Sequence, residues 1–377
     1  MLPLVTLADI QQAAARQRGV LTPTPLLPFP FADPPLLLKP ESLQPTGSFK
    51  VRGAYAAISA LPAAARQRGV VAHSSGNHAQ AVAWAAGLLG VRAVVVIPEN
   101  APAVKADATR RLGAQVVRCQ PGMAAREAAV RELVSEHGYT LIPPFDDPQV
   151  IAGQGTAGLE IAADRPDTDL VVVPVSGGGL ISGVATAVRA LCPRAAVIGV
   201  EPELAADARE SLRRGEQVGW PAEAVQRTIA DALRVERVGE LTLRHMLRYV
   251  DGIVTVTDGE LREAVRRLAT QARLVAEPGG AAAVAACLLR PASLPAARTR
   301  VAVLSGGNID PAALAAILTP GPGQDCGAPG GRPGPAGRED TGARPGPAGP
   351  EGTGGRPGPA GREDAAGQPS RPGRPVP

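Results

Sequence analysis

Short apolar runs alternate with stretches of helical length along most of the chain. Apolar runs that end at polar or glycine-rich turns are typical of strands buried on both faces. The predicted strands are residues 36–39, 69–72, 93–97, 115–118, 170–175, 196–200 and 301–304. The predicted helices are residues 7–18, 54–61, 79–89, 103–112, 124–136, 155–163, 180–191 and 259–271. This alternation predicts an α/β protein with two open, mostly parallel, twisted sheets flanked by helices.

Four polar turns each follow an apolar run. They are residues 45–53, which contain Ser48-Phe49-Lys50, and residues 74–78, 176–179 and 305–308. Ligands of open α/β sheets bind at the carboxyl ends of the strands, where these turns are expected. The four turns therefore make up the candidate functional site.

Lys50, in the first of these turns, is the candidate catalytic residue. A lysine amine is protonated at neutral pH, but a partly desolvated helix start near Arg52 favours the neutral, nucleophilic form. A solvated helix residue is the ordinary alternative for a single lysine. The three further polar turns favour the catalytic interpretation, in which the Lys50 amine forms an imine.

Two glycine-rich stretches have different interpretations. Residues 176–179, Ser-Gly-Gly-Gly, lie between a predicted strand and a predicted helix, so their N–H groups and the helix dipole suit a phosphate, with a plain tight turn as the alternative. Residues 153–158 match the dinucleotide fingerprint, but they lack the preceding strand and the later acidic residue that this function requires. We attribute these glycines to a helix start that packs closely against a sheet.

Taken together and in this order, the four turns resemble those of the fold-type-II pyridoxal-phosphate enzymes, in the branch of serine racemase and the serine/threonine dehydratases. The resemblance spans residues 5–318. It implies a tryptophan-synthase-β-like fold, in which a small domain of residues 47–146 is inserted into a large cofactor-binding domain of residues 1–46 and 147–320. It also implies a homodimer.

The resemblance gives roles to the side chains that contact the cofactor. Lys50 would hold pyridoxal 5'-phosphate as an imine, and Asn77 would donate to its phenolate oxygen. Ser305 would face the pyridine nitrogen as a neutral partner, which suits β-elimination better than transamination. The phosphate would be bound by Ser176, Gly177, Gly178 and Gly179.

The resemblance also implies a substrate site and a metal site. The implied donors to the substrate carboxylate are Ser74, Ser75, His78 and Arg126, with a structural role as the alternative for His78. The implied ligands of Mg²⁺ or Ca²⁺ are the side chains of Glu201 and Asp207 and the carbonyl of Ala205. These are hard oxygen ligands, although acidic residues at this spacing are also common on solvated turns.

The implied reaction is β-elimination from a small hydroxy amino acid, L-threonine or L-serine, which gives a 2-oxo acid and ammonia. Lys50 would remove the α-proton. Serine racemase and 3-hydroxyaspartate dehydratase remain open as main activities, because Ser75 is similar to the second-face acid of the racemases and Ala232 replaces the usual glycine of the family. A non-catalytic scaffold acting through its tail is the rival hypothesis; Lys50, Asn77 and Ser305 argue against it.

Composition limits the remaining possibilities. Residues 321–377 repeat an Arg-Pro-Gly-Pro-Ala-Gly unit from Arg332, Arg344 and Arg356, which predicts a disordered tail. A net charge of +4 with few aromatic residues makes nucleic-acid binding a weak hypothesis. No apolar run has the length of a membrane span, and the cysteines have no metal or redox spacing. We therefore expect a cytoplasmic enzyme without membrane or nucleic-acid partners.

Overall fold

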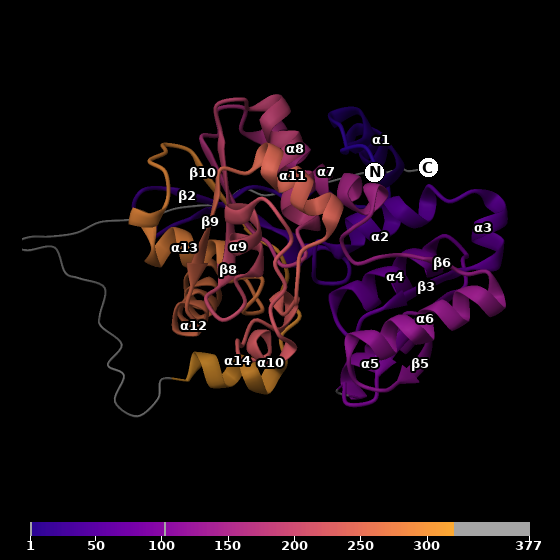
Figure 1. Ribbon diagram of the computed structural model, residues 1–377. Coiled ribbons are helices and arrows are strands. Elements are labelled where there is room, and N and C mark those ends of the chain that lie inside the picture. The colour runs from indigo at the N-terminus through magenta and orange to yellow at the C-terminus, as the bar shows by residue number, and fades with distance from the viewer. Residues whose placement is uncertain (1, 102, 320–377) are drawn as a thin grey trace, which may run out of the picture. The chain divides into compact units, whose positions relative to one another are not determined.

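The computed structural model describes residues 2–101 and 103–319 (Figure 1), all within the unit Met1–Gln324. Its larger sheet has six strands in the order β1-β2-β10-β7-β8-β9. They are β1 (Leu27–Phe29), β2 (Leu36–Pro40), β7 (Leu170–Pro174), β8 (Ala196–Pro202), β9 (Gly252–Val256) and β10 (Arg300–Leu304). Only the edge pair β1 and β2 is antiparallel.

The smaller sheet has four parallel strands in the order β5-β4-β3-β6. They are β3 (Val70–His73), β4 (Ala93–Pro98), β5 (Gln115–Cys119) and β6 (Thr140–Leu141). Strand β4 has the sequence Ala-Val-Val-Val-Ile-Pro and is buried along its whole length, as expected for a central parallel strand rich in β-branched residues. The prediction of two mostly parallel sheets flanked by helices is confirmed.

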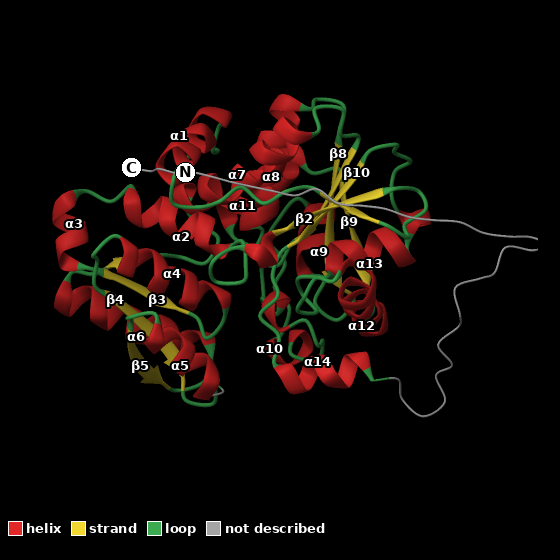
Figure 2. Ribbon diagram, turned by 180° about the vertical axis from the view of Figure 1, so that it is seen from behind, coloured by secondary structure: helices red, strands yellow, loops and turns green. Residues whose placement is uncertain are grey.

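Helices cover both sheets (Figures 1 and 2). They are α1 (Leu7–Gln17), α2 (Lys50–Ser59), α3 (Ala63–Arg68), α4 (Asn77–Leu88), α5 (Ala103–Arg111), α6 (Met123–His137), α7 (Pro148–Asp164), α8 (Gly179–Leu191), α9 (Asp207–Arg214), α10 (Ala222–Val225), α11 (Glu240–Tyr249), α12 (Asp258–Arg267), α13 (Ala282–Leu289) and α14 (Pro311–Leu318). Three 3-10 turns, η1 (Glu41–Leu43), η2 (Asp231–Leu233) and η4 (Pro291–Ser293), and a π-turn, η3 (Leu268–Ala272), complete the described elements. Among the described residues, no helix is long and apolar enough to cross a membrane.

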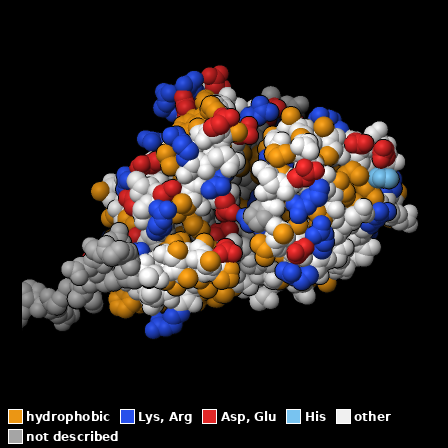
Figure 3. Space-filling view, turned by 90° about the horizontal axis from the view of Figure 1, so that it is seen from below, with side chains coloured by type: hydrophobic (Ala, Val, Ile, Leu, Met, Phe, Trp, Pro, Cys, Tyr) orange, Lys and Arg blue, Asp and Glu red, His pale blue; other side chains and the backbone are white. Residues whose placement is uncertain are grey.

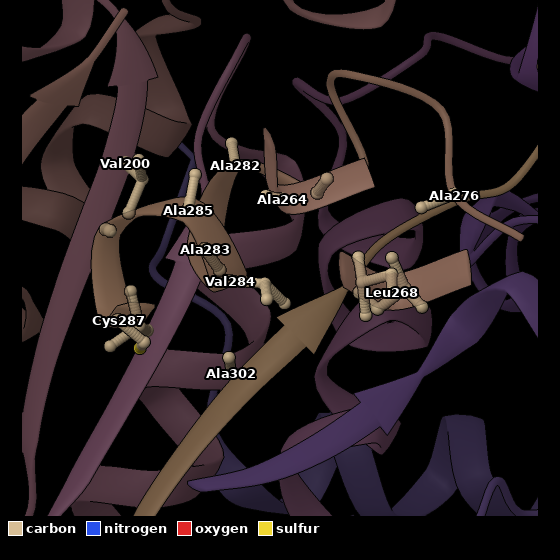
Figure 4. Close-up of a cluster of buried hydrophobic side chains, with 14 of the residues drawn as sticks. Val200, Ala264, Leu268, Ala276, Ala282, Ala283, Val284, Ala285, Cys287 and Ala302 are labelled. Atoms are coloured by element: carbon tan, nitrogen blue, oxygen red, sulfur yellow. The ribbon is translucent and has the colours of Figure 1, made fainter. Parts of the chain in front are cut away.

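One face of the larger sheet packs against α8, and the other packs against α13. Figure 4 shows side chains of this helix, among them Val284 and Cys287, in one cluster with Leu268 and Ala302 of neighbouring elements. Many of the cluster's side chains are alanines, which let the helix lie close to the sheet. This face of the six-stranded sheet is therefore covered by a closely packed helix.

Two helix starts differ from the prediction. Helix α2 begins at Lys50 instead of residue 54, and α7 begins at Pro148 instead of residue 155. The start of α7 is set by Asp147, whose Oδ1 accepts the N–H groups of Gln149 (2.8 Å) and Val150 (2.9 Å), with proline in the first helical position. The predicted helix at 259–271 is α12 followed by the π-turn η3.

The explanation of the glycines at 153–158 is wrong, because they lie inside α7 and not at its start. A Cβ on Gly153 would lie 2.5 Å from the carbonyl oxygen of Arg52 in α2. A Cβ on Gly155 would lie 2.9 Å from the carbonyl oxygen of Gly183 in α8. The glycines therefore allow α7 to pack against two neighbouring helices, and the close contact is between helices and not with a sheet.

The strands of the smaller sheet all lie between residues 70 and 141, and those of the larger sheet lie outside this range. This order supports the proposed insertion of a small domain, residues 47–146, into a large domain formed by residues 1–46 and 147–320. The predicted tail of residues 321–377 lies outside the described residues.

Candidate active site

Lys50 is the first residue of α2 and lies next to the turn that follows β10. Ser48 forms an isolated antiparallel bridge with Gly306, and the N–H of Phe49 donates to the carbonyl of Ser305 (3.1 Å). The half-buried Lys50 side chain donates from Nζ to the carbonyl of Pro144 (2.7 Å). Burial lowers the pKa of this amine to about 8, so about a tenth of it is neutral at pH 7, far more than for an exposed lysine.

Arg52, two residues further along α2, bonds this helix to η1 and to α7. Its guanidinium is 1% exposed and is bonded bidentately to Glu41 (2.7 and 2.8 Å) and to Glu160 (2.6 and 2.8 Å), with a further bond to Thr156 (3.0 Å). Burial opposes the charges of Arg52 and Glu41, but their mutual attraction outweighs it. The attraction between the two charges therefore raises the pKa of Arg52 and lowers the pKa of Glu41. Lys39 adds a second cation, bonded to Glu160 (2.6 Å).

The glycine loop of residues 176–179 joins β7 to α8. A Cβ on Gly177 would lie 2.3 Å from the ring of Phe145, so no side chain fits there. Gly178 has φ +91°, in the left-handed region that favours glycine. The first amides of α8 have no preceding helical turn to bond to, and they point with the helix dipole towards the loop. The loop has the chemistry of an anion cradle.

Ser176 is the loop residue that is not glycine, and its φ of +53° also lies in the left-handed region. Such a backbone costs a non-glycine residue about 1–2 kcal/mol. The Ser176 hydroxyl donates to the carbonyl of Ala232 (3.2 Å), which ties the loop to the turn η2. The strain is thus partly offset by one hydrogen bond.

Asn77, the first residue of α4, belongs to a chain of amide contacts. Its Nδ2 donates to Glu277 Oε1 (2.6 Å), and its Oδ1 accepts from Asn308 Nδ2 (2.8 Å). Asn308 also donates to the carbonyl of Thr46 (2.7 Å), in the turn that leads to Lys50. These contacts bring together the turns after β3, before α2 and after β10.

Ser74, Ser75 and His78 lie on the turn after β3 and in α4, with different surroundings. Ser74 Oγ accepts the N–H of Gly76 (3.2 Å), and Ser75 is half-buried. His78 is 3% exposed, and its Nε2 is bonded to the carbonyl of Ile142 (2.9 Å). Burial and the nearby Lys50 charge lower the His78 pKa to about 3, which keeps the ring neutral. This contact favours the structural alternative for His78.

Arg126 lies in the first turn of α6. Its Nε donates to the carbonyl of Gly122 (3.2 Å), and its charge helps burial to lower the pKa of His73, the last residue of β3. Arg126 therefore lies near the strand end that leads into Ser74 and Ser75. No hydrogen bond joins it to those serines among the described residues, so its role as a carboxylate partner stays a prediction.

Glu201 and Asp207 form a buried acidic pair beside the start of α9. Glu201 accepts the N–H groups of Ala208 (3.1 Å) and Arg209 (2.8 Å), whereas Asp207 Oδ2 is buried without a partner among the described residues. Burial and the Asp207 charge raise the Glu201 pKa well above its usual range, and burial raises that of Asp207 to about 7. Ala205 is buried in the intervening loop. Within residues 2–101 and 103–319, no three His, Cys, Asp or Glu side chains form a metal-binding group.

Contacts connect Lys50, Asn77, Ser305 and the glycine loop in one region. Phe49 bonds to Ser305, Asn308 reaches Asn77, and the segment from Pro144 to Phe145 contacts both Lys50 and the loop. Figure 3 shows that basic and acidic side chains are interspersed on the face it presents.

Sequence reasoning missed Glu277, which is 4% exposed beside Asn77. It also missed Asp146, whose side chain accepts the N–H groups of Glu240 and Thr242 at the start of α11 (3.1 Å each). The available signal for Glu277 is the polar turn Glu-Pro-Gly-Gly at 277–280, immediately before an apolar run. Its pairing with Asn77 has no sequence signal, because the two residues are 200 positions apart.

Comparison with known proteins identifies relatives over most of the chain. The chain is 44% identical to the L-threonine ammonia-lyase of Thermotoga maritima over 326 residues, which covers 84% of this chain and 79% of that protein. It is 40% identical to the L-threo-3-hydroxyaspartate ammonia-lyase of Saccharomyces cerevisiae over 320 residues, which covers 83% and 96%. The crystal structure of serine racemase from Dictyostelium discoideum superposes with a TM-score of 0.77 at 38% identity and covers 81% of this chain and 99% of that one.

A family model described as "Pyridoxal-phosphate dependent enzyme" matches residues 18–306, which include all four polar turns except the last two residues of the fourth. Both relatives and the solved structure agree with the resemblance expected from those turns. The chain therefore belongs to the family of pyridoxal-phosphate dependent enzymes.

Proposed function

We propose that the protein is an ammonia-lyase that converts L-threonine or L-serine to a 2-oxo acid and ammonia by β-elimination. The proposal is carried by the Lys50 amine, which is half-buried, has a pKa lowered to about 8 and is connected to the glycine loop through the segment of Pro144 and Phe145. The activity of the threonine ammonia-lyase relative supports the same conclusion.

The residues present fit pyridoxal phosphate. Gly177 and Gly178 have no room for side chains, and the glycine loop offers backbone N–H groups to a phosphate. The Ser48 hydroxyl, two residues before Lys50, is buried without a hydrogen-bond partner among the described residues. Asn77 and Ser305 supply an amide donor and a neutral hydroxyl for the cofactor's phenolate and ring nitrogen. Lys50 is the amine that would hold the cofactor.

When bound, pyridoxal phosphate withdraws electrons from the α-carbon of the attached amino acid and makes its α-hydrogen acidic. Once the substrate's amino group has taken its place, Lys50 would be a free amine and would take that proton, for which a pKa of about 8 is suited near neutral pH. The β-hydroxyl leaves with the electron pair, so the elements of water are removed. Hydrolysis of the resulting enamine by water then releases ammonia and the 2-oxo acid.

Ser74, Ser75 and Arg126 are proposed to hold the substrate carboxylate, because they lie at or near the end of β3. Ser75 would also be a second acid opposite Lys50, which would give a minor serine racemase activity. Serine racemisation or 3-hydroxyaspartate elimination as the main activity is the alternative, supported by the named activities of the other relatives. A non-catalytic scaffold remains the rival from another class.

The chain offers a sharp test because it has only three lysines, Lys39, Lys50 and Lys105. Cofactor linked to a lysine absorbs visible light, and borohydride fixes it to that lysine. We expect the reduced cofactor on the Lys50 peptide alone, since Lys39 is 0% exposed and paired with Glu160. Lys50→Ala should lose the visible band and all turnover, whereas Lys105→Arg should keep both. A colourless parent protein, or cofactor on another lysine, would contradict the proposal.

A divalent cation, Mg²⁺ or Ca²⁺, is proposed between Glu201, Asp207 and the carbonyl of Ala205. The support is the unpartnered Asp207 Oδ2 beside a second buried carboxyl, which a hard cation would satisfy. Added Mg²⁺ or Ca²⁺ should raise the melting temperature of the chelator-treated protein. An Asp207→Asn variant should show no such rise.

We propose a homodimer from the family resemblance, and a cytoplasmic location from the composition of the chain. Sedimentation equilibrium of the purified full chain should give twice the mass of 38.4 kDa. A monomer over the tested concentrations would contradict the assembly without affecting the proposed reaction.

A further inference from the structure

Glu277 is a buried carboxyl that none of the steps above uses. It is 4% exposed, and burial raises its pKa to about 8. Its Oε1 accepts a hydrogen bond from Asn77 Nδ2 at 2.6 Å, the shortest contact that Asn77 makes. Burying a carboxyl costs free energy unless the group is hydrogen-bonded. The contact with Asn77 supplies such a bond to Glu277.

The contacts of Asn308 determine which way the Asn77 amide faces. The carbonyl of Thr46 can only accept, so the group of Asn308 that meets it at 2.7 Å must be the amide nitrogen. The same nitrogen donates to Asn77 Oδ1 at 2.8 Å. The oxygen of Asn77 therefore faces Asn308, and its nitrogen faces Glu277. One N–H of that nitrogen is bonded to Glu277, and no acceptor among residues 2–101 and 103–319 occupies the second, which can therefore donate to a ligand.

The position of Glu277 is fixed by the backbone of the turn after β10. Its N–H donates to the carbonyl of Gly306 (3.1 Å), and a Cβ on Gly306 would lie 2.2 Å from Glu277 Oε1. The same imaginary Cβ would lie 3.3 Å from Asn77 Nδ2. The absence of a side chain at Gly306 thus makes room for the contact between the carboxyl and the amide.

We propose that Glu277 is a positioning residue that, together with Asn308, fixes the amide of Asn77 so that its second N–H is available to the phenolate oxygen of the cofactor. The proposal rests on the proposed function, because it requires pyridoxal phosphate at this site. Glu277 acts through Asn77 and takes no part in the proton transfers assigned to Lys50 and Ser75.

The test is a double-mutant cycle on the purified full chain, with pyridoxal phosphate affinity and the visible absorption maximum as readouts. Glu277→Ala should weaken cofactor binding about tenfold and shift the absorption maximum, as expected for one lost hydrogen bond at a buried site. In an Asn77→Ala background the same change should alter affinity less than about twofold. Glu277→Gln should bind within about threefold of the parent, because its amide oxygen can still accept from Asn77.

If Glu277→Ala weakens cofactor binding equally in the parent and in the Asn77→Ala background, the proposal is overturned, since Glu277 would then not act through Asn77. A Glu277→Gln variant that binds the cofactor as weakly as Glu277→Ala would overturn the proposal as well. Should Glu277→Ala fail to fold, Asn308→Ala replaces it in the same cycle. Its cofactor affinity should fall by about threefold, a smaller loss because Asn308 is exposed. A parent without a reducible visible band refutes the proposed function itself, whereas a parent with the band and an additive cycle refutes only the role of Glu277.

Discussion

Replacing Arg52 by lysine should destabilise the protein strongly even though the positive charge is kept. The guanidinium has five N–H donors, and five hydrogen bonds to Glu41, Glu160 and Thr156 occupy them. A lysine ammonium has three donors at a single point and cannot form two bidentate pairs. At least two acceptors in a buried network would lose their partner.

The magnitude follows from the chemistry of the lost contacts. A hydrogen bond to a charged group contributes about 1.5–3 kcal/mol, and a buried acceptor left without a partner costs a similar amount. Two lost bonds therefore correspond to about 3–6 kcal/mol. Retention of the charge and the bond that Lys39 already makes to Glu160 (2.6 Å) subtract a part of this loss. We expect the free energy of unfolding to fall by about 3 kcal/mol.

Urea denaturation of the full chain in excess pyridoxal phosphate measures this change as a lower transition midpoint at unchanged slope. The matched control is Arg110→Lys, because Arg110 makes one bond to Asp107 (2.7 Å) and both side chains are about half exposed, at 49% and 52%. The control should change the free energy of unfolding by less than about 0.5 kcal/mol.

A loss of less than about 1 kcal/mol for Arg52→Lys, with the slope unchanged, would refute the reasoning. It would mean that water or a rearranged Lys39 satisfies Glu41 and Glu160 as well as the guanidinium does. The attachment of α2 to η1 and α7 would then not depend on this network.

Three further predictions concern other parts of the site. Ser176→Gly should raise the free energy of unfolding by about 0.5–1 kcal/mol in urea denaturation, because it removes the left-handed strain at φ +53° at the loss of one hydrogen bond, whereas Ser182→Gly inside α8 should lower it. The His78 pKa lies at about 3 in the folded chain against 6.5 in the unfolded chain, so its stabilising effect is complete above pH 6.5 and is lost as the pH falls towards 3. Denaturation midpoints should therefore drop more steeply over that range in the parent than in His78→Gln, and parallel curves would contradict the burial of His78. Without divalent ions, Asp207→Asn should melt at a higher temperature than the parent, since one of two adjacent buried acids is removed; a lower melting temperature would contradict the pairing with Glu201.

The sequence predicts the class of fold and the order of the polar turns well, because both depend on local patterns. Strand β4 is apolar throughout since it is covered on both faces, and the pattern is visible without any partner. The elements that the sequence pattern does not predict include β9, α11 and α14. Strand β9 lies at the edge of its sheet and is only partly buried, so its pattern is weaker than that of a central strand.

The glycines of α7 show where local rules fail. Glycine in a helix interior is unfavourable by itself, which is why the sequence places the helix start after Gly153. In the fold, α2 and α8 approach α7 so closely at Gly153 and Gly155 that a Cβ would collide with their backbones. The packing of three helices outweighs the propensity, and no single segment of sequence contains that information.

The fates of two lysines show the same limit for the chemistry. Lys39 and Lys50 are eleven positions apart, and both lie at the boundary between β2 and α2. Lys39 Nζ is bonded to the carboxylate of Glu160, 121 positions away, which balances its charge in the interior. The hydrogen bond that the described residues give to Lys50 Nζ is with the neutral carbonyl of Pro144, so burial acts against its charge and lowers its pKa. A distant carboxylate thus makes one lysine structural, and the lack of such a bond leaves the other amine available for chemistry.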